Sequence, residues 1–175
     1  MPRQVAVALT AAGVAPFRVE LAVGGTPLAV AGTLCRAEWR VRHFAWDQTC
    51  DPRTRPRKWQ ALLDGPARVD SLVPAVAFDW GSRAPRENVP ADRFATLATA
   101  DIRFPAGRWR VGTISDDGIR VWVDDRRIID DWTWHAPREN AAVVDLDAGE
   151  HAFRVEHFEI DGHATLRLWF EPAGG

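Results

Sequence analysis

Apolar and polar side chains alternate with a period of two over most of the chain from residue 36 onward. The alternation is clear at 39–43, 109–113, 119–123, 153–157 and 166–170. Such a period marks strands that bury one face, and turn signals rich in Asp, Gly and Pro separate the runs. Short strands at this spacing predict an all-β fold, which we expect to be an antiparallel β-sandwich or barrel. Residues 56–65 carry a helical pattern instead, and we expect one short helix there.

The N-terminal part has the pattern of a separate hairpin. Residues 17–23 alternate in the same way, and Gly24-Gly25 follows as a strong turn signal. The first residues also match a secretory signal weakly, but the strand interpretation is favoured. At 175 residues the chain suits one domain plus an extra element. We therefore expect a strand-rich N-terminal extension at 1–35 and a β-sandwich domain at 36–172.

Charge and hydropathy exclude two classes of partner. The net charge is −2, and acidic and basic residues are mixed along the whole chain. A nucleic-acid-binding surface needs a clustered basic face, so we expect no nucleic-acid partner. No apolar run is long enough for a transmembrane helix.

Cys35 and Cys50 would close a loop of about 15 residues if they paired, and the sequence leaves free thiols and a disulfide equally open.

Catalytic signatures are missing from the sequence. It contains no nucleophile elbow, phosphate-binding loop or dinucleotide fingerprint. Acidic residues are plentiful, but no pair is marked by surroundings that would raise one pKa, as glycoside hydrolysis requires. His151, His157 and His163 recur every six residues, yet a turn separates the last from the others and zinc ligands are normally closer in sequence. We therefore expect that the chain is not an enzyme.

The stretch "ISDDGIRVWVDD" at 114–125 holds two acidic pairs. Asp117-Gly118 has the local signature of a two-residue hairpin turn. Asp116 stands directly beside Asp117, however, and adjacent carboxylates repel unless they are solvated or neutralised by a cation. Hard cations such as calcium prefer carboxylate oxygens. Local pattern favours the plain turn and leaves a metal site open. We expect the other pair, at 124–125, to be a solvated hairpin turn.

The order of motifs along the chain resembles the domain family named after anthrax protective antigen. The matching pieces are "FDWG", "PAD-F", "PAG-W-V", "SDDGIRVWVDD", "IIDDW", "AGEH-F-VEHFE" and "A-L-LWF", from about Trp39 to Phe170. "SDDG-R-W-D" followed by "ID-W" is the most specific part. This module occurs in bacterial glycosidases, secreted adhesins and fungal flocculins. It folds as a β-sandwich or barrel, so the resemblance implies the same fold class as the alternation does.

The resemblance also implies a calcium site. In sugar-binding members of the family, the acidic pair is joined by a cis peptide and chelates calcium, which takes two sugar hydroxyls. Asp116 and Asp117 match that pair. A second loop would complete the site with Glu159, where the adhesins have Asn, and with the backbone carbonyls of Asp161 and His163. Glutamate suits calcium, but its extra negative charge would alter which sugar fits or shut sugar out.

These expectations combine into a functional hypothesis. Trp134 and His135 are candidates for an exposed sugar platform beside the metal-bound sugar, because Trp offers a flat apolar face; a core position for Trp134 is equally open. The chain would be a calcium-dependent carbohydrate-binding module, with glycans or polysaccharide and other modules of a larger protein as partners. The alternative is a structural or assembly module in which calcium only stabilises loops. The resemblance and weak calcium affinity suit an extracellular or cell-surface location.

Overall fold

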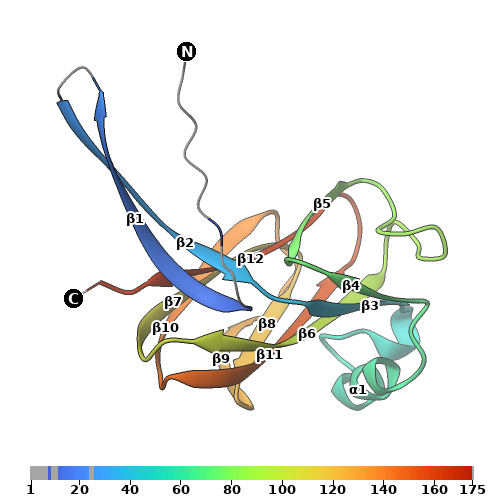
Figure 1. Ribbon diagram of the computed structural model, residues 1–175. Coiled ribbons are helices and arrows are strands. Elements are labelled where there is room, and N and C mark those ends of the chain that lie inside the picture. The colour runs from blue at the N-terminus through green and yellow to red at the C-terminus, as the bar shows by residue number, and fades with distance from the viewer. Residues whose placement is uncertain (1–7, 9–11, 24–25, 175) are drawn as a thin grey trace.

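The computed structural model describes residues 8, 12–23 and 26–174 of the chain. Strands dominate this part, and Figure 1 shows their arrangement. Their bounds are β1 Gly13–Val23, β2 Thr26–Arg36, β3 Trp39–Ala45, β4 Val69–Val73, β5 Ala77–Gly81, β6 Phe94–Phe104, β7 Gly107–Asp116, β8 Ile119–Val123, β9 Arg126–Asp131, β10 Arg138–Leu146, β11 Gly149–Glu159 and β12 Ala164–Pro172. The helical elements are α1 Pro56–Asp64 and the short 3-10 helix η1 Gln48–Cys50. The helix predicted from the pattern at 56–65 is confirmed.

Two antiparallel sheets form the body of the protein. One has six strands in the order β4-β3-β6-β11-β8-β9, and the other has four in the order β10-β7-β12-β5. The alternating apolar residues of both sheets meet in one buried core, whose largest members include Trp39, Phe94, Phe104, Trp109 and Phe153. Burial of one face of each sheet is what a period of two requires. The prediction of an all-β antiparallel sandwich is confirmed.

The acidic segment at 116–118 is not a hairpin turn. β7 belongs to the four-stranded sheet and β8 to the six-stranded sheet, so the chain crosses here from one sheet to the other. The plain-turn interpretation of Asp117-Gly118 was therefore wrong. By contrast, β8 and β9 do form a hairpin, with Val123 opposite Arg126. Asp124 and Asp125 have φ values of 48° and 62° and are exposed, as a tight primed turn requires.

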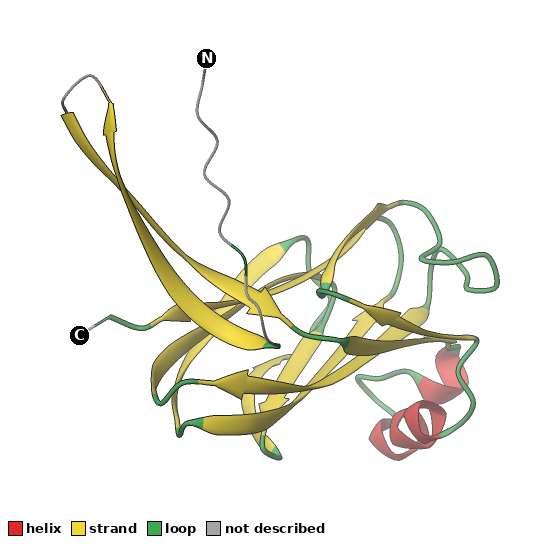
Figure 2. Cartoon of the chain, viewed as in Figure 1, coloured by secondary structure: helices red, strands yellow, loops and turns green. Residues whose placement is uncertain are grey.

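β1 and β2 form a separate two-stranded sheet that extends from the sandwich (Figures 1 and 2). Val23 lies opposite Thr26 at the far end of this pair of strands. The turn predicted at Gly24-Gly25 lies outside the described residues. Val14, at the base of the hairpin, is buried in the core. Of the segment considered as a secretory signal, residues 1–15, the structure describes only 8 and 12–15, and its last three residues begin β1. The division of the chain near residue 36 stays a prediction.

Helix α1 covers one part of the outer face of the six-stranded sheet. Proline at its first position suits a helix start, and Trp59 and Leu63, four residues apart, lie on its buried side. They join a second apolar cluster, with Phe44, Trp46, Ala95, Leu97 and Phe158.

In the described residues, no helix is long and apolar enough to cross a membrane. Cys35 and Cys50 are free thiols rather than a disulfide.

Gly118 lies where β8 begins and packs directly on Phe158. A Cβ placed on this glycine would lie 2.2 Å from Cε1 of the fully buried Phe158 ring. The backbones are also joined here, because Phe158 N donates to the Gly118 carbonyl at 3.0 Å. This close approach explains the glycine after the acidic pair, and it holds the start of β8 against the end of β11.

Replacing Gly118 with alanine should therefore destabilise the protein. We expect Gly118→Ala to lower the free energy of unfolding by about 1–3 kcal/mol, because the buried ring has to move. Urea unfolding measures the change. Gly65→Ala is the matched control, since a Cβ there comes no closer than 3.4 Å to its neighbours. Equal stability of the two variants would contradict the packing role of Gly118.

Candidate functional site

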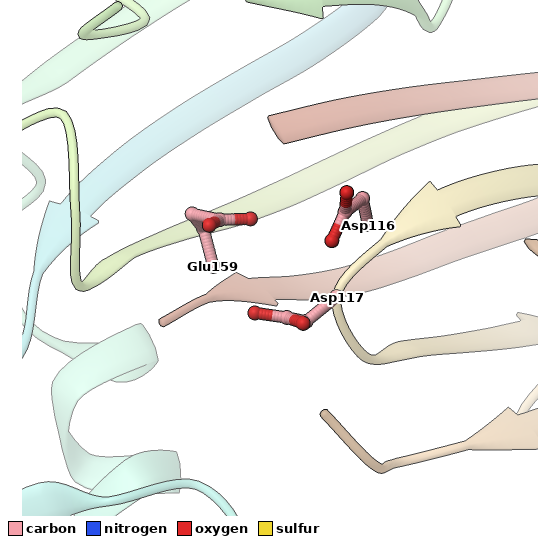
Figure 3. Close-up of side chains that lie close together, drawn as sticks. All are labelled: Asp116, Asp117 and Glu159. Atoms are coloured by element: carbon pink, nitrogen blue, oxygen red, sulfur yellow. The ribbon is translucent and has the colours of Figure 1, made fainter. Parts of the chain in front are cut away.

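Three acidic side chains converge, as Figure 3 shows, where β7 and β11 end. Asp116 is the last residue of β7, Asp117 follows it in the crossover to β8, and Glu159 is the last residue of β11. One carboxylate oxygen from each lies within 4.8 Å of the other two. The crossover from β7 to β8 and the crossover from β11 to β12 therefore supply a single group of carboxylates, which we call the acidic site.

The peptide bond between Asp116 and Asp117 is cis, as the family resemblance implies. Asp117 is held by two backbone amides from different loops. Its Oδ1 accepts from His135 N at 3.0 Å, and its Oδ2 accepts from Ile160 N at 2.8 Å. The Asp116 backbone is also fixed, because its carbonyl oxygen lies 2.9 Å from Nε2 of the buried His157. The acidic pair is thus positioned before any ligand arrives.

Glu159 is the most unusual member of the acidic site. Its side chain is fully buried, and neither carboxylate oxygen has a hydrogen-bond partner in the described part of the chain. A buried charge without a partner is strongly disfavoured. Beside the acidic pair, the Glu159 carboxylate therefore needs either to take up a proton or to have a cation next to it.

The pKa values of all three carboxyls respond to this environment. Burial raises the pKa of Glu159 to about 9, and the charges of Asp117 and Asp116 add to the effect. Burial raises the pKa of Asp116 to about 6, again with a contribution from Asp117. Burial also raises the pKa of Asp117, although its two backbone donors oppose the change. Three neighbouring carboxyls that resist ionisation together form a place where positive charge would be stabilised.

The residues present fit a hard cation. Calcium takes six to eight oxygen ligands, and three carboxylates supply only part of such a shell. The remaining positions would be open to backbone carbonyls, water or hydroxyl groups of a ligand. Since no nitrogen or sulfur ligand joins this group in the described residues, its chemistry favours calcium over zinc.

The predicted ligands Asp161 and His163 lie in the loop between β11 and β12, and both are exposed. Their side chains do not belong to the group of three carboxylates that approach one another. We predicted that they contribute backbone carbonyls, and that remains a prediction. Their loop is held in place through Gly162 N, which donates to Oδ1 of Asp92 at 3.3 Å.

The two residues predicted as a sugar platform differ. Trp134 is 62% exposed, whereas the His135 side chain is only 3% exposed. The prediction that His135 presents an exposed ring was therefore wrong. Its Nδ1 lies 2.8 Å from the Ala136 carbonyl, and its Nε2 lies 3.4 Å from Oδ2 of Asp131 without hydrogen-bond geometry. His135 contributes its backbone amide, which donates to Asp117. The exposed Trp134 directly precedes it in the chain.

Sequence reasoning missed the two backbone donors to Asp117, His135 N and Ile160 N. Every residue type except proline carries such a donor, so no residue pattern could have marked these two. The three histidines with a spacing of six make separate contacts. His151 pairs with Asp124 at 2.6 Å, His157 contacts the Asp116 carbonyl, and His163 is exposed.

An antiparallel β-sandwich with a cis acidic pair and a buried glutamate at one end defines the class: a β-sandwich domain with a buried group of three carboxyls between its crossovers. The chain belongs to the PA14 domain family, whose model matches residues 57–173. The structure places β3 between β4 and β6, so the six-stranded sheet also includes residues that precede this match.

Three similar proteins carry different descriptions. The chain is 28% identical over 104 residues to the anti-sigma-I factor RsgI3 of Acetivibrio thermocellus. The aligned residues cover 58% of this chain and 16% of that protein. An anti-sigma factor domain-containing protein from Clostridium clariflavum has a similar structure, with a TM-score of 0.63, 20% identity, and coverage of 79% of this chain and 42% of that one. The PA14 sugar-binding domain from an RTX adhesin also has a TM-score of 0.63, with 15% identity, 80% coverage of this chain and 92% of that one.

These likenesses differ in what they establish. At such identities the two solved structures show the fold alone. The chain spans about a sixth of the length of the curated relative, since 16% of that protein is covered. The similar proteins include both a domain described as sugar-binding and proteins described as anti-sigma factors, so these likenesses do not point to a single role.

Proposed function

We propose that this chain is a calcium-dependent carbohydrate-binding module without catalysis of its own. One observation carries the proposal: the buried Glu159 carboxylate has no hydrogen-bond partner in the described residues and faces two further carboxylates. Calcium bound by Asp116, Asp117 and Glu159 would supply the missing positive charge and offer coordination positions to sugar hydroxyls. The adhesin domain of similar fold, described as sugar-binding, supports this assignment.

The three carboxylates of the acidic site differ in their exposure and in their contacts. Asp117 is 1% exposed and Glu159 is not exposed, whereas Asp116 is 6% exposed. Asp116 is therefore the most exposed of the three, and Asp117 would tie a bound cation to the loops that hold His135 and Ile160. Trp134, which is exposed and directly precedes the His135 amide that binds Asp117, would offer a flat apolar face to the sugar ring. Glycans or polysaccharide outside the cell or at its surface are the proposed partners, together with other modules of a longer protein.

A glycan array with calcium and with chelator tests the proposal. We expect glycan signals in calcium that disappear in chelator, and the loss of those signals in the double variant Asp116→Asn plus Asp117→Asn. Signals that are unaffected by both treatments would contradict the calcium-dependent mechanism. No signals in either condition would contradict carbohydrate binding at this site.

The exposed tryptophan provides a second test. We expect Trp134→Ala to weaken calcium-dependent glycan binding by about tenfold, because the sugar loses its apolar platform. Its thermal midpoint should stay close to that of the parent protein, since the ring is 62% exposed. Val143→Ala, at a site that is 46% exposed on β10, is the control. Unchanged affinity of Trp134→Ala, measured by titration calorimetry, would remove Trp134 from the site.

The burial of the acidic site also supports one alternative. With Asp117 and Glu159 almost fully enclosed, calcium could act only as a link between the two crossovers in a structural or assembly module. The similarity to anti-sigma factor proteins gives this alternative a second support. It predicts a calcium-dependent midpoint with no glycan signal, so the array and the unfolding experiment together separate the two functions.

A further inference from the structure

A second candidate site lies on the outer face of the six-stranded sheet. One row of directly paired residues crosses five strands: Leu72 on β4, Arg40 on β3, Thr99 on β6, Arg154 on β11 and Trp122 on β8. Directly opposed residues of antiparallel strands point to the same face. The chain neighbours of these residues, such as Val41 and Val121, are buried in the core. The whole row therefore points away from the core.

Helix α1 leaves this row uncovered and borders it instead. A groove of about 680 Å³ lies over the row, with Gln60 of α1 among its lining residues. Leu72, at one end, is 62% exposed. Strands are spaced about 4.8 Å apart, so the four steps from Leu72 to Trp122 span about 19 Å. A chain of several sugar rings fits a groove of this length better than a single small molecule does.

The arginines in the groove are held in fixed positions. Nε and Nη2 of Arg154 both donate to Oε1 of Glu156, at 2.9 and 2.6 Å. Arg40 Nε donates to Oδ1 of Asp70 at 3.0 Å. Within the described residues, Nη1 of each arginine has no partner and stays available as a donor. Preorganised donors cost less entropy when a ligand binds.

The charge of the groove selects the class of ligand. Two arginines, Arg40 and Arg154, stand against four carboxylates, so the lining has a formal net charge of −2; the carboxylates belong to Glu38, Asp101, Asp125 and Glu156. This balance disfavours nucleic acids and acidic polysaccharides. The groove still offers both donors and acceptors along its length. A neutral sugar, whose hydroxyls both donate and accept, matches that pattern.

Trp122 supplies the apolar contact that a sugar ring needs. Its indole lies in the row, with the Arg154 guanidinium carbon 5.9 Å from the ring centre. An aromatic ring beside a fixed donor can pack against the C–H face of a pyranose while the donor reaches its hydroxyls. We propose that this groove binds a neutral oligosaccharide without calcium. The proposal is independent of the acidic site, which lies at the crossovers.

Tryptophan fluorescence titration of the full chain in chelator tests the groove. The probes are cellohexaose, xylohexaose, mannohexaose and maltohexaose, each at concentrations up to millimolar. We expect at least one of them to bind in chelator. Two variants address the groove: Trp122→Ala removes the platform, and Ala152→Arg fills the groove from an exposed position without removing core packing. Each should weaken binding by about tenfold or more.

Two control variants separate the groove from the acidic site. Asp116→Asn plus Asp117→Asn, and Trp134→Ala, should leave binding in chelator unchanged. If none of the four probes binds in chelator, or if binding survives both groove variants, the groove proposal is wrong. Calcium-dependent glycan binding would then still stand on its own. Binding in chelator that is lost in both groove variants supports the groove whatever the result for calcium.

Discussion

Calcium is expected to raise the thermal midpoint of the parent protein by several degrees. A ligand that binds only the folded state adds roughly 2.7 kcal/mol when its concentration is about 100 times Kd. For a domain of this size that corresponds to about 5–10 °C. The physical reason is that Glu159, Asp116 and Asp117 lie close enough to share one cation. Differential scanning calorimetry in calcium and in chelator measures the shift.

Glu159→Gln is the sharpest variant for this experiment. In chelator, glutamine resembles the protonated carboxyl that burial favours, so the variant and the parent protein should unfold at similar temperatures. In calcium, the variant should lose most of the shift because it removes a charged ligand. Asp125→Asn, which removes one exposed charge in the hairpin between β8 and β9, should keep the full shift. Equal midpoints of the parent protein in calcium and in chelator would contradict a calcium site.

Stability in chelator is expected to fall as pH rises through neutrality. Burial and neighbouring charges raise the pKa of Glu159 from 4.5 to about 9. Between these values the folded state keeps a proton that the unfolded state has released, so rising pH favours unfolding. The slope approaches about 1.4 kcal/mol per pH unit for one proton. Asp116, whose pKa is raised to about 6, acts in the same direction at lower pH.

Buried histidines determine the pH range in which the effect of Glu159 on stability can be measured. Burial lowers the pKa of His43 and of His157 to about 4. Their folded forms stay neutral below pH 6.5, where the unfolded forms take up protons, so stability falls as pH decreases in that range. The effect of Glu159 is therefore clearest between about pH 6.5 and 9. There, Glu159→Gln or added calcium should flatten the urea-unfolding profile, and a parent profile that is already flat would contradict the assignment.

The sequence predicted the fold because the evidence for it is local. Alternation along β3, β7 and β11 specifies which side chains face the core, and the pattern at 56–65 specifies one helix. The same local evidence misplaced Asp117-Gly118, because a turn signal does not say which sheet the next strand joins. Sheet membership depends on pairing between distant strands, which a single sequence does not display.

The candidate site was partly predictable for a different reason. Asp116, Asp117 and Glu159 came from the family resemblance, and the structure brings these three side chains together. The exposure of His135 was predicted wrongly, because local sequence does not show that its loop turns the ring inward. The amides that hold Asp117 were beyond prediction, since they depend on loops meeting in space rather than on residue type.

The separation of the site residues along the chain has a kinetic consequence. Asp117 and Ile160, which are joined by a hydrogen bond, are 43 residues apart, and their crossovers connect the two sheets at one end. Contacts between such distant segments tend to form late, because the intervening loop must close first. A cation held there would then stabilise the folded state more than the transition state, and so slow unfolding with little effect on the folding rate. Bound calcium would therefore slow the unfolding of the folded sandwich. The lifetime of the folded protein would then depend on the calcium concentration around it.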